Sequence, residues 1–496
     1  RWGMTNNLTV NATIKPDFAE VESDAEQVVI DPRDALYFPE KRPFFLDGLD
    51  QFSVPNNLIY TRRIIAPDGA LKLTGQVAGT SIGLLSAIDA PDTSTTARDR
   101  TLYNIFRAQR DFANQSQIGM AYTDREVGTA SNRMADLDGQ VLFGQVYNAS
   151  FQAAESFNHP AGTSAVSAAP LFSGIFARNG KRFGLRYTFS SISNDFVPGA
   201  GFISRAGVVN AGLDHRATWF GPRGARLQTL TGDISVNDTW DYARFVRHGD
   251  AEDKKLHVST SAGLRGGWTL GAGVYWETFG YDPALYANYR MLTPSRDTLP
   301  FVGTPRIPNR DYVTTLSTPQ WSRFSGSLLY IFGQDENFYE WAQANIVYSS
   351  LTVSVRPSAQ ARIDGSLAYQ GYWRRTDGSL VGRDVIPQVT LEYQLTRSIF
   401  FRILGQYHAS ETADLRDETR TFYPLLIGNT LAAATRARTY NGQYLFSYQP
   451  NPGTAIFLGY GHEAAGNPDP TARFTWEPLQ PMSDYFFVKW TYLFRM

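Results

Sequence analysis

Polar and apolar residues alternate along most of this chain, in stretches of about ten residues that end at turn-like segments. In one such stretch, Phe183, Leu185 and Tyr187 are separated by single small or polar residues. Because successive side chains of a strand point to opposite faces, this pattern predicts strands with one apolar and one polar face. The same alternation recurs within residues 71–77, 363–374, 389–395, 401–408 and 486–495.

A soluble β-sandwich would also alternate, so further features must decide between a soluble and a membrane-spanning sheet. Aromatic residues gather at the ends of the apolar faces, as the interfacial girdles of membrane barrels require. Examples are the pairs Trp268 and Trp276, Tyr369 and Trp373, and Tyr444 and Tyr448. The polar faces carry charged residues in mid-strand, which suits a wet interior. Because the chain has no apolar run near the ~18 residues that a membrane helix needs, we expect it to cross a membrane as a closed barrel.

The sequence therefore predicts an all-β fold, a single transmembrane antiparallel β-barrel of about 22 strands, within a range of about 20 to 24. We expect one domain over residues 1–496, with an irregular segment at 33–58 and long outer loops at 281–320 and 409–437. Such a barrel would lie in the outer membrane of a Gram-negative bacterium, with the lipid bilayer as its partner. The expected strands are 8–15, 25–31, 70–79, 80–89, 101–113, 115–125, 135–144, 146–157, 167–178, 181–193, 205–219, 225–240, 255–266, 268–279, 321–333, 337–355, 361–374, 385–396, 398–408, 438–449, 454–463 and 484–495.

The segment Tyr37–Leu46 breaks the strand pattern, because Pro39 and Pro43 bracket a group of aromatic and charged residues. Proline lacks a backbone donor and moves the preceding residue out of the helical region, so neither a long helix nor a central strand fits. A barrel of about 22 strands has an interior too wide for side chains to fill, and barrels of this size are typically obstructed by an internal element. We therefore favour a plug inside the barrel over the alternative, a periplasmic collar.

The plug and its surroundings supply the candidate site residues. The plug candidates are Phe38, Pro39, Glu40, Lys41, Arg42, Pro43, Phe44 and Phe45. The residues expected to line the lumen are Lys72, Arg182, Arg186, Glu277, Arg362, Asp364, Arg374, Glu392 and Arg402. We expect the charged plug residues to pair with charged lumen residues, among them Arg182, Arg186, Asp364 and Glu392.

Composition and motifs argue against several other functions. The net charge of −1 gives no basic field for nucleic acid, and the lack of cysteine excludes disulfides, thiol catalysis and Cys-ligated metals. Ser81 lies in a GxSxG sequence, but a nucleophile elbow needs a helix after the turn and none is expected here. Ser81 is therefore interpreted as a hairpin or lumen residue. The six histidines have no metal-ligand spacing, so we predict no catalytic residue, no metal and no cofactor.

The acidic run from Asp17 to Glu26 has two interpretations. Its clustered carboxylates could hold a hard cation such as Ca²⁺, but the EF-hand spacing is absent. We favour a solvated rim or strand edge.

Several segments carry a family resemblance, namely Asn11–Phe18, Val21–Glu22, Phe38–Leu46, Tyr60–Ile64, Lys72–Gly75, Gly83–Leu85, Gly201–Ile203 and Val488–Arg495. They resemble a family of uncharacterised bacterial outer-membrane barrels that usually follow a domain similar to family 9 carbohydrate-binding modules. Such a domain is not among these residues, and the ending in Met496 departs from the common aromatic barrel terminus. The resemblance implies the barrel fold and the outer-membrane location, and it points to a saccharide-like solute.

Two functions remain open from the sequence. The first is passage, in which a plugged or gated pore admits a saccharide or another small solute past aromatic and charged lumen residues. The second is anchoring, in which a sealed barrel holds a surface domain or other envelope proteins. An enzyme is not expected.

Overall fold

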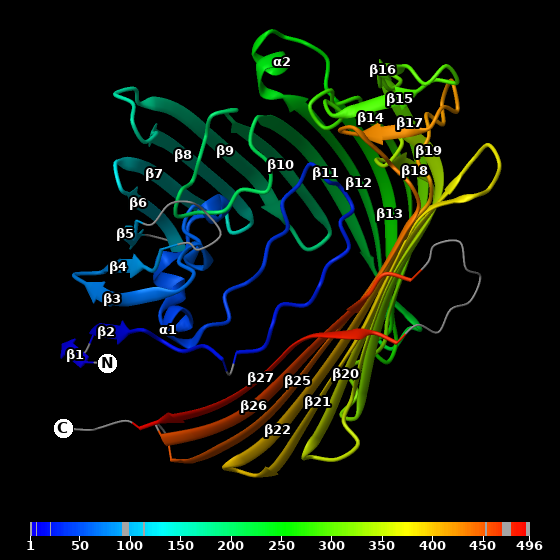
Figure 1. The fold of residues 1–496 in the computed structure, drawn as a ribbon. Coiled ribbons are helices and arrows are strands. Elements are labelled where there is room, and N and C mark those ends of the chain that lie inside the picture. The colour runs from blue at the N-terminus through cyan, green and yellow to red at the C-terminus, as the bar shows by residue number, and fades with distance from the viewer. Residues whose placement is uncertain are drawn as a thin grey trace. The chain divides into compact units, whose positions relative to one another are not determined.

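The computed structural model describes residues 2–5, 7–19, 21–91, 99–112, 115–451, 454–468 and 478–492. The chain divides into two compact units, and each combines segments that are distant in sequence. Unit 1 comprises residues 1–21, 33–216 and 235–252, and unit 2 comprises residues 22–32, 217–234 and 253–496. Most of the regular structure in both units is β-strand (Figure 1).

Unit 1 is built on strands that pair antiparallel with their neighbours in sequence, and Figure 1 shows β3 to β10 following one another in this way. These strands are β1 (Trp2–Thr5), β2 (Leu8–Ile14), β3 (Pro67–Val77), β4 (Thr80–Asp89), β5 (Thr101–Phe112), β6 (Ser116–Val127), β7 (Ala130–Phe143), β8 (Tyr147–His159), β9 (Ser167–Asn179) and β10 (Phe183–Ile192). Unit 1 also contains the short helix α2 (Tyr242–Val246). Two further strands, β11 (Val208–Phe220) and β12 (Leu227–Asp241), contribute to both units.

Unit 2 repeats the same antiparallel pairing. Its long strands are β13 (Asp253–Leu264), β14 (Thr269–Gly280), β17 (Arg306–Ser317), β18 (Phe324–Asn337), β19 (Ala342–Val355), β20 (Ala361–Arg374), β21 (Leu380–Thr396), β22 (Ile399–Thr412), β25 (Thr435–Asn451), β26 (Thr454–Gly466) and β27 (Gln480–Thr491). A separate four-stranded sheet is formed by β15 (Tyr289–Leu292), β16 (Thr298–Pro300), β23 (Leu425–Ile427) and β24 (Thr430–Leu431).

The strands have the two unlike faces that the alternation predicts. In β3, Leu71 is 53% exposed and the next residue, Lys72, is 1% exposed. In β9, Phe172 is 53% exposed, whereas Leu171 is fully buried. Exposed large apolar side chains recur on nearly every long strand, and Trp490 of β27, for example, is 71% exposed. We call the exposed apolar face of each strand its outer face and the opposite face its inner face.

The predicted all-β, antiparallel fold is confirmed, with 23 strands in ladders of this kind among the described residues against the expected 22. Most strand bounds agree within a few residues. Part of the last expected strand, residues 493–495, lies outside the described residues.

The expected strand at residues 25–31 is wrong, because this segment of unit 2 is irregular. Part of its backbone pairs with side chains. The backbone N–H of Glu26, for example, donates to Oε1 of Gln406 at 3.0 Å. A short apolar run was mistaken for a strand here, since such a run does not by itself specify a pairing partner.

A strand was also missed inside the expected outer loop 281–320. β17 pairs with β14 and β18 over most of its length. Its inner face carries Asn309 and Asp311, and its proline, Pro308, points outward. The polar inner face and the proline gave this stretch the composition of a loop.

The N-terminal segment, which we define as residues 33–66, lies in unit 1 and forms no strand. Its regular elements are the helix α1 (Pro43–Leu46) and the 3-10 turns η1 (Leu49–Phe52), η2 (Pro55–Asn57) and η3 (Thr61–Arg63). Pro43 is the first residue of α1. A backbone N–H at this position would have no partner within the helix, so proline costs no hydrogen bond there. In Figure 1 these blue turns lie against the first strands of unit 1, and η1 contacts β4 and β5. Among the described residues, no helix combines the length and the apolar character needed to cross a membrane.

Candidate functional site

The N-terminal segment packs apolar side chains onto the inner faces of the unit 1 strands. One buried cluster joins Phe45, Phe52 and Ile64 to Ala70, Leu85, Ala87, Tyr103, Ile105 and Ala200. A second cluster joins Val54 and Leu58 to Ala121, Met134, Ala154, Ala169, Leu171, Ile192 and Phe196. Full burial of side chains of this size contributes about 1.5–3 kcal/mol each, so these contacts dominate the docking of the segment.

Two polar residues of β2 and β3 hold the C-terminal end of α1. The ammonium group of Lys72 donates to the backbone carbonyls of Phe44 and Asp47 and lies 4.9 Å from the centroid of the Phe44 ring. Asn11, opposite Lys72 in the ladder, donates to the carboxylate of Asp47 at 2.6 Å. The last carbonyls of a helix have no partner within the helix, and Lys72 supplies one. Lys72 was expected to line the lumen, and it lies on the inner face in contact with this segment.

Glu40, Arg42 and Thr61 form a hydrogen-bonded group, which we call the charged knot, that joins two parts of the N-terminal segment. Arg42 donates to both carboxylate oxygens of Glu40, at 2.8 and 2.7 Å, and to the carbonyl of Thr61 at 2.9 Å. The Thr61 hydroxyl donates to Glu40 at 2.6 Å, and the guanidinium group lies 4.3 Å from the centroid of the Phe45 ring. Such two-point Arg–carboxylate pairs are among the stronger hydrogen bonds in proteins. The expectation that Glu40 and Arg42 pair with lumen charges is therefore wrong, because they pair with each other.

The knot makes the docking of the segment depend on pH. Burial alone would raise the pKa of Glu40, but hydrogen bonds from Arg42 and Thr61 outweigh it and hold the pKa below its ordinary value of 4.5. A lowered folded-state pKa contributes stability that is complete above about pH 4.5 and is lost as the pH falls through the folded-state value. We expect hydrogen exchange in residues 33–66, corrected for intrinsic rates, to accelerate below about pH 4.5. Glu40→Gln should remove this pH dependence, and an unchanged pH profile in that variant would contradict the assignment.

The remaining plug candidates lie in the same network. The carbonyl of Phe38 accepts a hydrogen bond from the Tyr60 hydroxyl at 2.6 Å, and that of Pro39 accepts one from Arg62 at 3.0 Å. The backbone N–H of Lys41 donates to Glu40 at 3.0 Å. These bonds join the first half of the N-terminal segment to its second half.

Further hydrogen bonds join the segment to more distant strands and connections of unit 1. The Asn56 amide donates to Gln152 at 2.7 Å, and the Gln152 amide donates back to the carbonyl of Pro55 at 2.9 Å. The backbone N–H of Tyr60 donates to the carbonyl of Ala200 at 2.8 Å. The N-terminal segment is therefore held by partners that range along the chain from β2 to the β10–β11 connection.

The acidic residues that precede the segment face basic side chains of unit 2. Glu22 lies 3.6 Å from Arg402, and Glu26 lies 2.7 Å from His408. Both partners are on β22. Arg402, a predicted lumen residue, thus contacts part of the acidic run, and these two carboxylates do not converge on each other.

Other predicted lumen residues pair locally. Arg362 forms an ion pair with Asp364 at 2.8 Å and lies opposite Glu392 in the β20–β21 ladder. Arg374 is buried and forms an ion pair with Glu340 at 2.6 Å. The structure therefore gives Arg374 a structural role at the end of β20.

Two arginines and the GxSxG serine complete the predicted residues. Arg182 and Arg186 are exposed, and Arg186 lies on the inner face of β10, between outward-pointing Leu185 and Tyr187. Ser81 follows the turn at residues 78–79 and pairs with Gln76 in the β3–β4 ladder. Because β4 continues as a strand, Ser81 lacks the helix of a nucleophile elbow.

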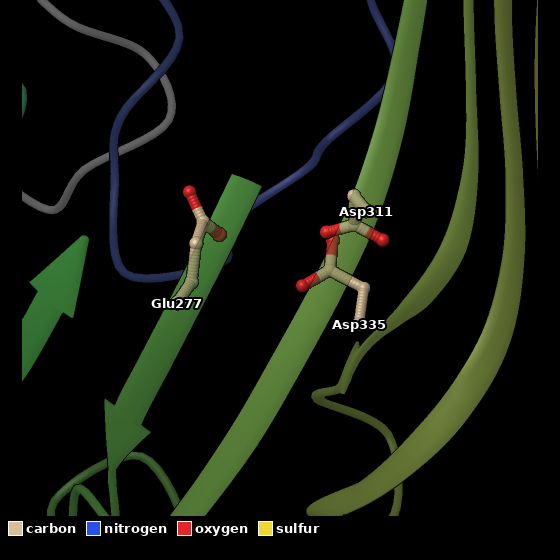
Figure 2. Close-up of side chains that lie close together, drawn as sticks. All are labelled: Glu277, Asp311 and Asp335. Carbon is tan, nitrogen blue, oxygen red and sulfur yellow. The ribbon is translucent and has the colours of Figure 1, made fainter. Parts of the chain in front are cut away.

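A carboxylate cluster that the sequence did not indicate lies on three neighbouring strands of unit 2. Glu277 of β14, Asp311 of β17 and Asp335 of β18 place one oxygen each within 4.8 Å of the others (Figure 2). Asp311 is 3% exposed. Glu277 was a predicted lumen residue, but Asp311 fell in the expected loop, so the grouping could not be anticipated.

An aromatic cavity of about 270 Å³ also lies in unit 2. Its walls are Val29, Ile30, Pro32, Leu285, Tyr289, Phe338, Tyr339 and Tyr372. Apolar and aromatic walls with a few hydroxyl groups are typical of small-molecule sites.

The strand faces define the class of protein. A water-soluble sheet would not leave large apolar side chains exposed on strand after strand, whereas a lipid-facing surface requires them. Antiparallel ladders between chain neighbours satisfy the backbone hydrogen bonds that a bilayer cannot. The chain is an integral outer-membrane protein of the β-barrel class.

One family model and several solved structures are similar to this chain. Residues 1–74 match a domain of unknown function, DUF5916. No curated protein matches the chain. Among solved structures, the copper transporter OprC is similar with 12% identity and a TM-score of 0.46, over 79% of this chain and 71% of that one.

Two further solved structures are similar at lower TM-scores. The FrpB iron transporter from Neisseria meningitidis has 7% identity and a TM-score of 0.37, over 86% of this chain and 78% of that one. The siderophore receptor PiuA from Acinetobacter baumannii has 9% identity and a TM-score of 0.39, over 85% of this chain and 72% of that one.

Proposed function

We propose that the protein is a plugged pore that passes a small solute across the outer membrane, and that residues 33–58 form the plug. The observation that carries this proposal is the docking of the N-terminal segment on the inner strand faces of unit 1. A collar beneath the barrel would contact strand ends, whereas this segment contacts Gln152 and Leu171, which lie well inside their strands.

A saccharide-like solute is the finer part of the proposal. The aromatic cavity supports it, because tyrosine rings give sugar rings flat apolar surfaces and hydroxyl partners. Val29, Ile30 and Pro32 contribute to the cavity wall, so a bound solute would touch the irregular chain just before the plug.

A sealed anchor is the second candidate function. It is favoured by the completeness of the docking, since Leu58 and Lys72 are at most 1% exposed. Passage requires that the plug moves or leaves a path, and anchoring requires neither.

A disulfide tether distinguishes the two functions. A Cβ at Gly48 would lie 3.3 Å from the Cβ of Thr74, close to the ~3.5–4.5 Å of a disulfide. The chain has no cysteine, so Gly48→Cys with Thr74→Cys gives a single engineered pair. Gly48 has a φ of 71°, so a side chain at this position costs about 1–2 kcal/mol in backbone strain. The apolar contacts of the segment contribute more than this, so the variant should still dock.

We would measure uptake of labelled gluco-oligosaccharides by intact cells that produce the tethered protein, with and without reductant. A mobile plug predicts uptake only after reduction, and each single-cysteine variant serves as a control. Equal uptake in both states would show that the plug need not move, and no uptake in either state or in the wild type would favour the anchor.

A further inference from the structure

We propose that Glu277, Asp311 and Asp335 bind one hard divalent cation, and that Ca²⁺ is the ion that suits them best. The three residues lie on successive strands, β14, β17 and β18, near the end from which the connection 281–305 departs. Figure 2 shows Glu277 and Asp311 on adjacent strands, with the carboxylate of Asp335 beside that of Asp311.

The spacing of the oxygens fits a shared ion. One oxygen from each residue lies within 4.8 Å of the other two. Ca²⁺ holds its oxygen ligands at about 2.3–2.6 Å, so two ligands of the same ion can be up to about 5 Å apart. The three carboxylates can therefore contact one Ca²⁺ without any strand moving.

Unpartnered buried atoms point independently to a missing cation. Oδ1 of Asp311 and Oδ1 of Asn309 are buried and have no hydrogen-bond partner in the part of the chain that the structure describes. Asn309 is 5% exposed and pairs directly with Glu277 in the β14–β17 ladder. Burying such atoms without a partner is costly, and a bound cation would satisfy both.

The neighbouring hydrogen bonds hold the donors in place. The Asn309 amide nitrogen donates to Asp335 at 3.0 Å and to Glu336 at 2.6 Å. The backbone N–H of Glu336 also donates to Asp335, at 3.0 Å. The amide nitrogen of Asn309 is therefore engaged, and its carbonyl oxygen is the atom that has no partner among the described residues. Second-shell bonds of this kind orient ligands in established metal sites.

One lysine, Lys255, balances only part of the negative charge of these carboxylates. Lys255 and His257 of β13 both approach Glu277, at 3.9 and 2.6 Å. Asp311, Asp335 and Glu336 add a group of three further carboxylates on β17 and β18, of which Asp311 and Glu336 are buried. A divalent cation between Glu277 and this group would offset the remaining repulsion.

The chemistry of the donors selects the class of ion. The candidate ligands are carboxylate and amide oxygens, which suit Ca²⁺, Mg²⁺ or Mn²⁺ rather than a soft or imidazole-preferring metal. The nearest imidazole, His257, already bonds to Glu277 through Nε2. The proposed site adjoins the apolar cluster that contains Phe279, Ile307 and Phe338, so a bound ion would tie three strands together beneath that cluster.

The test is calorimetric titration of CaCl₂ into the full chain, purified in detergent and freed of metal with EDTA. We expect one saturable site in the wild type and a Kd raised at least about tenfold in Asp311→Asn and in Asp335→Asn. The matched control is Asp484→Asn, whose carboxylate is half exposed and bonds to Tyr460 and His462. Its Kd should equal that of the wild type. Heat-modifiable gel mobility checks that each variant is folded, and if Asp311→Asn does not fold, Asp335→Asn decides.

Three outcomes would overturn the site. The first is a wild type without saturable Ca²⁺ binding, and the second is an equal Kd in the wild type and both cluster variants. The third is loss of binding in Glu22→Gln rather than in the cluster variants, which would move the site to the acidic run.

Discussion

Replacing residues 33–58 by a flexible Gly/Ser linker should turn a silent protein into a conducting one in planar bilayers. The segment buries two apolar clusters against the inner faces of β3 to β9, and large barrels without an internal element enclose an aqueous channel. A linker, rather than a plain deletion, keeps the chain long enough to join residue 32 to β3. We expect conductance to rise from near zero to that of an open pore.

The matched control replaces residues 160–166, the exposed β8–β9 connection, by a Gly/Ser linker of the same composition as that used for residues 33–58. That variant should remain silent. Steady conductance of the intact protein would contradict both the plug and the sealed anchor and would favour a porin-like role. A folded linker variant that stays silent would contradict the plug alone.

Lys72→Met should weaken the docking of the N-terminal segment without unfolding the strands. The variant removes two charge-assisted hydrogen bonds to carbonyls at the end of α1 and leaves those carbonyls buried without a donor. Hydrogen bonds to a charged group contribute about 1.5–3 kcal/mol each, so the docking should weaken by about 3 kcal/mol. Since 1.4 kcal/mol is about a tenfold change in an equilibrium constant, hydrogen exchange in residues 33–66 should accelerate by about 100-fold.

The control for this variant is Lys254→Met, which changes an exposed lysine on the outer face of β13. Exchange in residues 33–66 should then equal that of the wild type. Exchange that is unchanged in Lys72→Met would mean that the apolar clusters alone hold the segment. Exchange that accelerates throughout the strands would mean that Lys72 supports the sheet itself.

The strand array could be predicted because its signal is local. Alternation in residues such as Phe183, Leu185 and Tyr187 depends only on the period of a strand, and each strand pairs with its neighbour in sequence. The prolines likewise predicted that Tyr37–Leu46 would be irregular, since they act on adjacent residues.

The contacts of the site could not be predicted in the same way. The pairing of Glu40 with Arg42, two residues away, could not be predicted, because each could equally have formed an ion pair with a charged residue of a strand. The carboxylate cluster depends on the register of β14, β17 and β18, and one residue of slip would turn Asp311 to the outer face. Asp311 carried no strand signal, because its stretch has Pro308 and a polar inner face.

The contacts of the N-terminal segment also set an order of assembly. Each strand can pair as soon as its chain neighbour is present, and short loops close quickly. The segment, however, bonds through Tyr60 to Ala200 and through Asn57 to Phe202, about 140 residues later in the chain. The N-terminal segment is thus synthesised well before the residues that it binds, and it docks only after they are present. The segment cannot dock completely until the β10–β11 connection exists, so an unfinished chain exposes the aromatic residues of this segment, which favours aggregation.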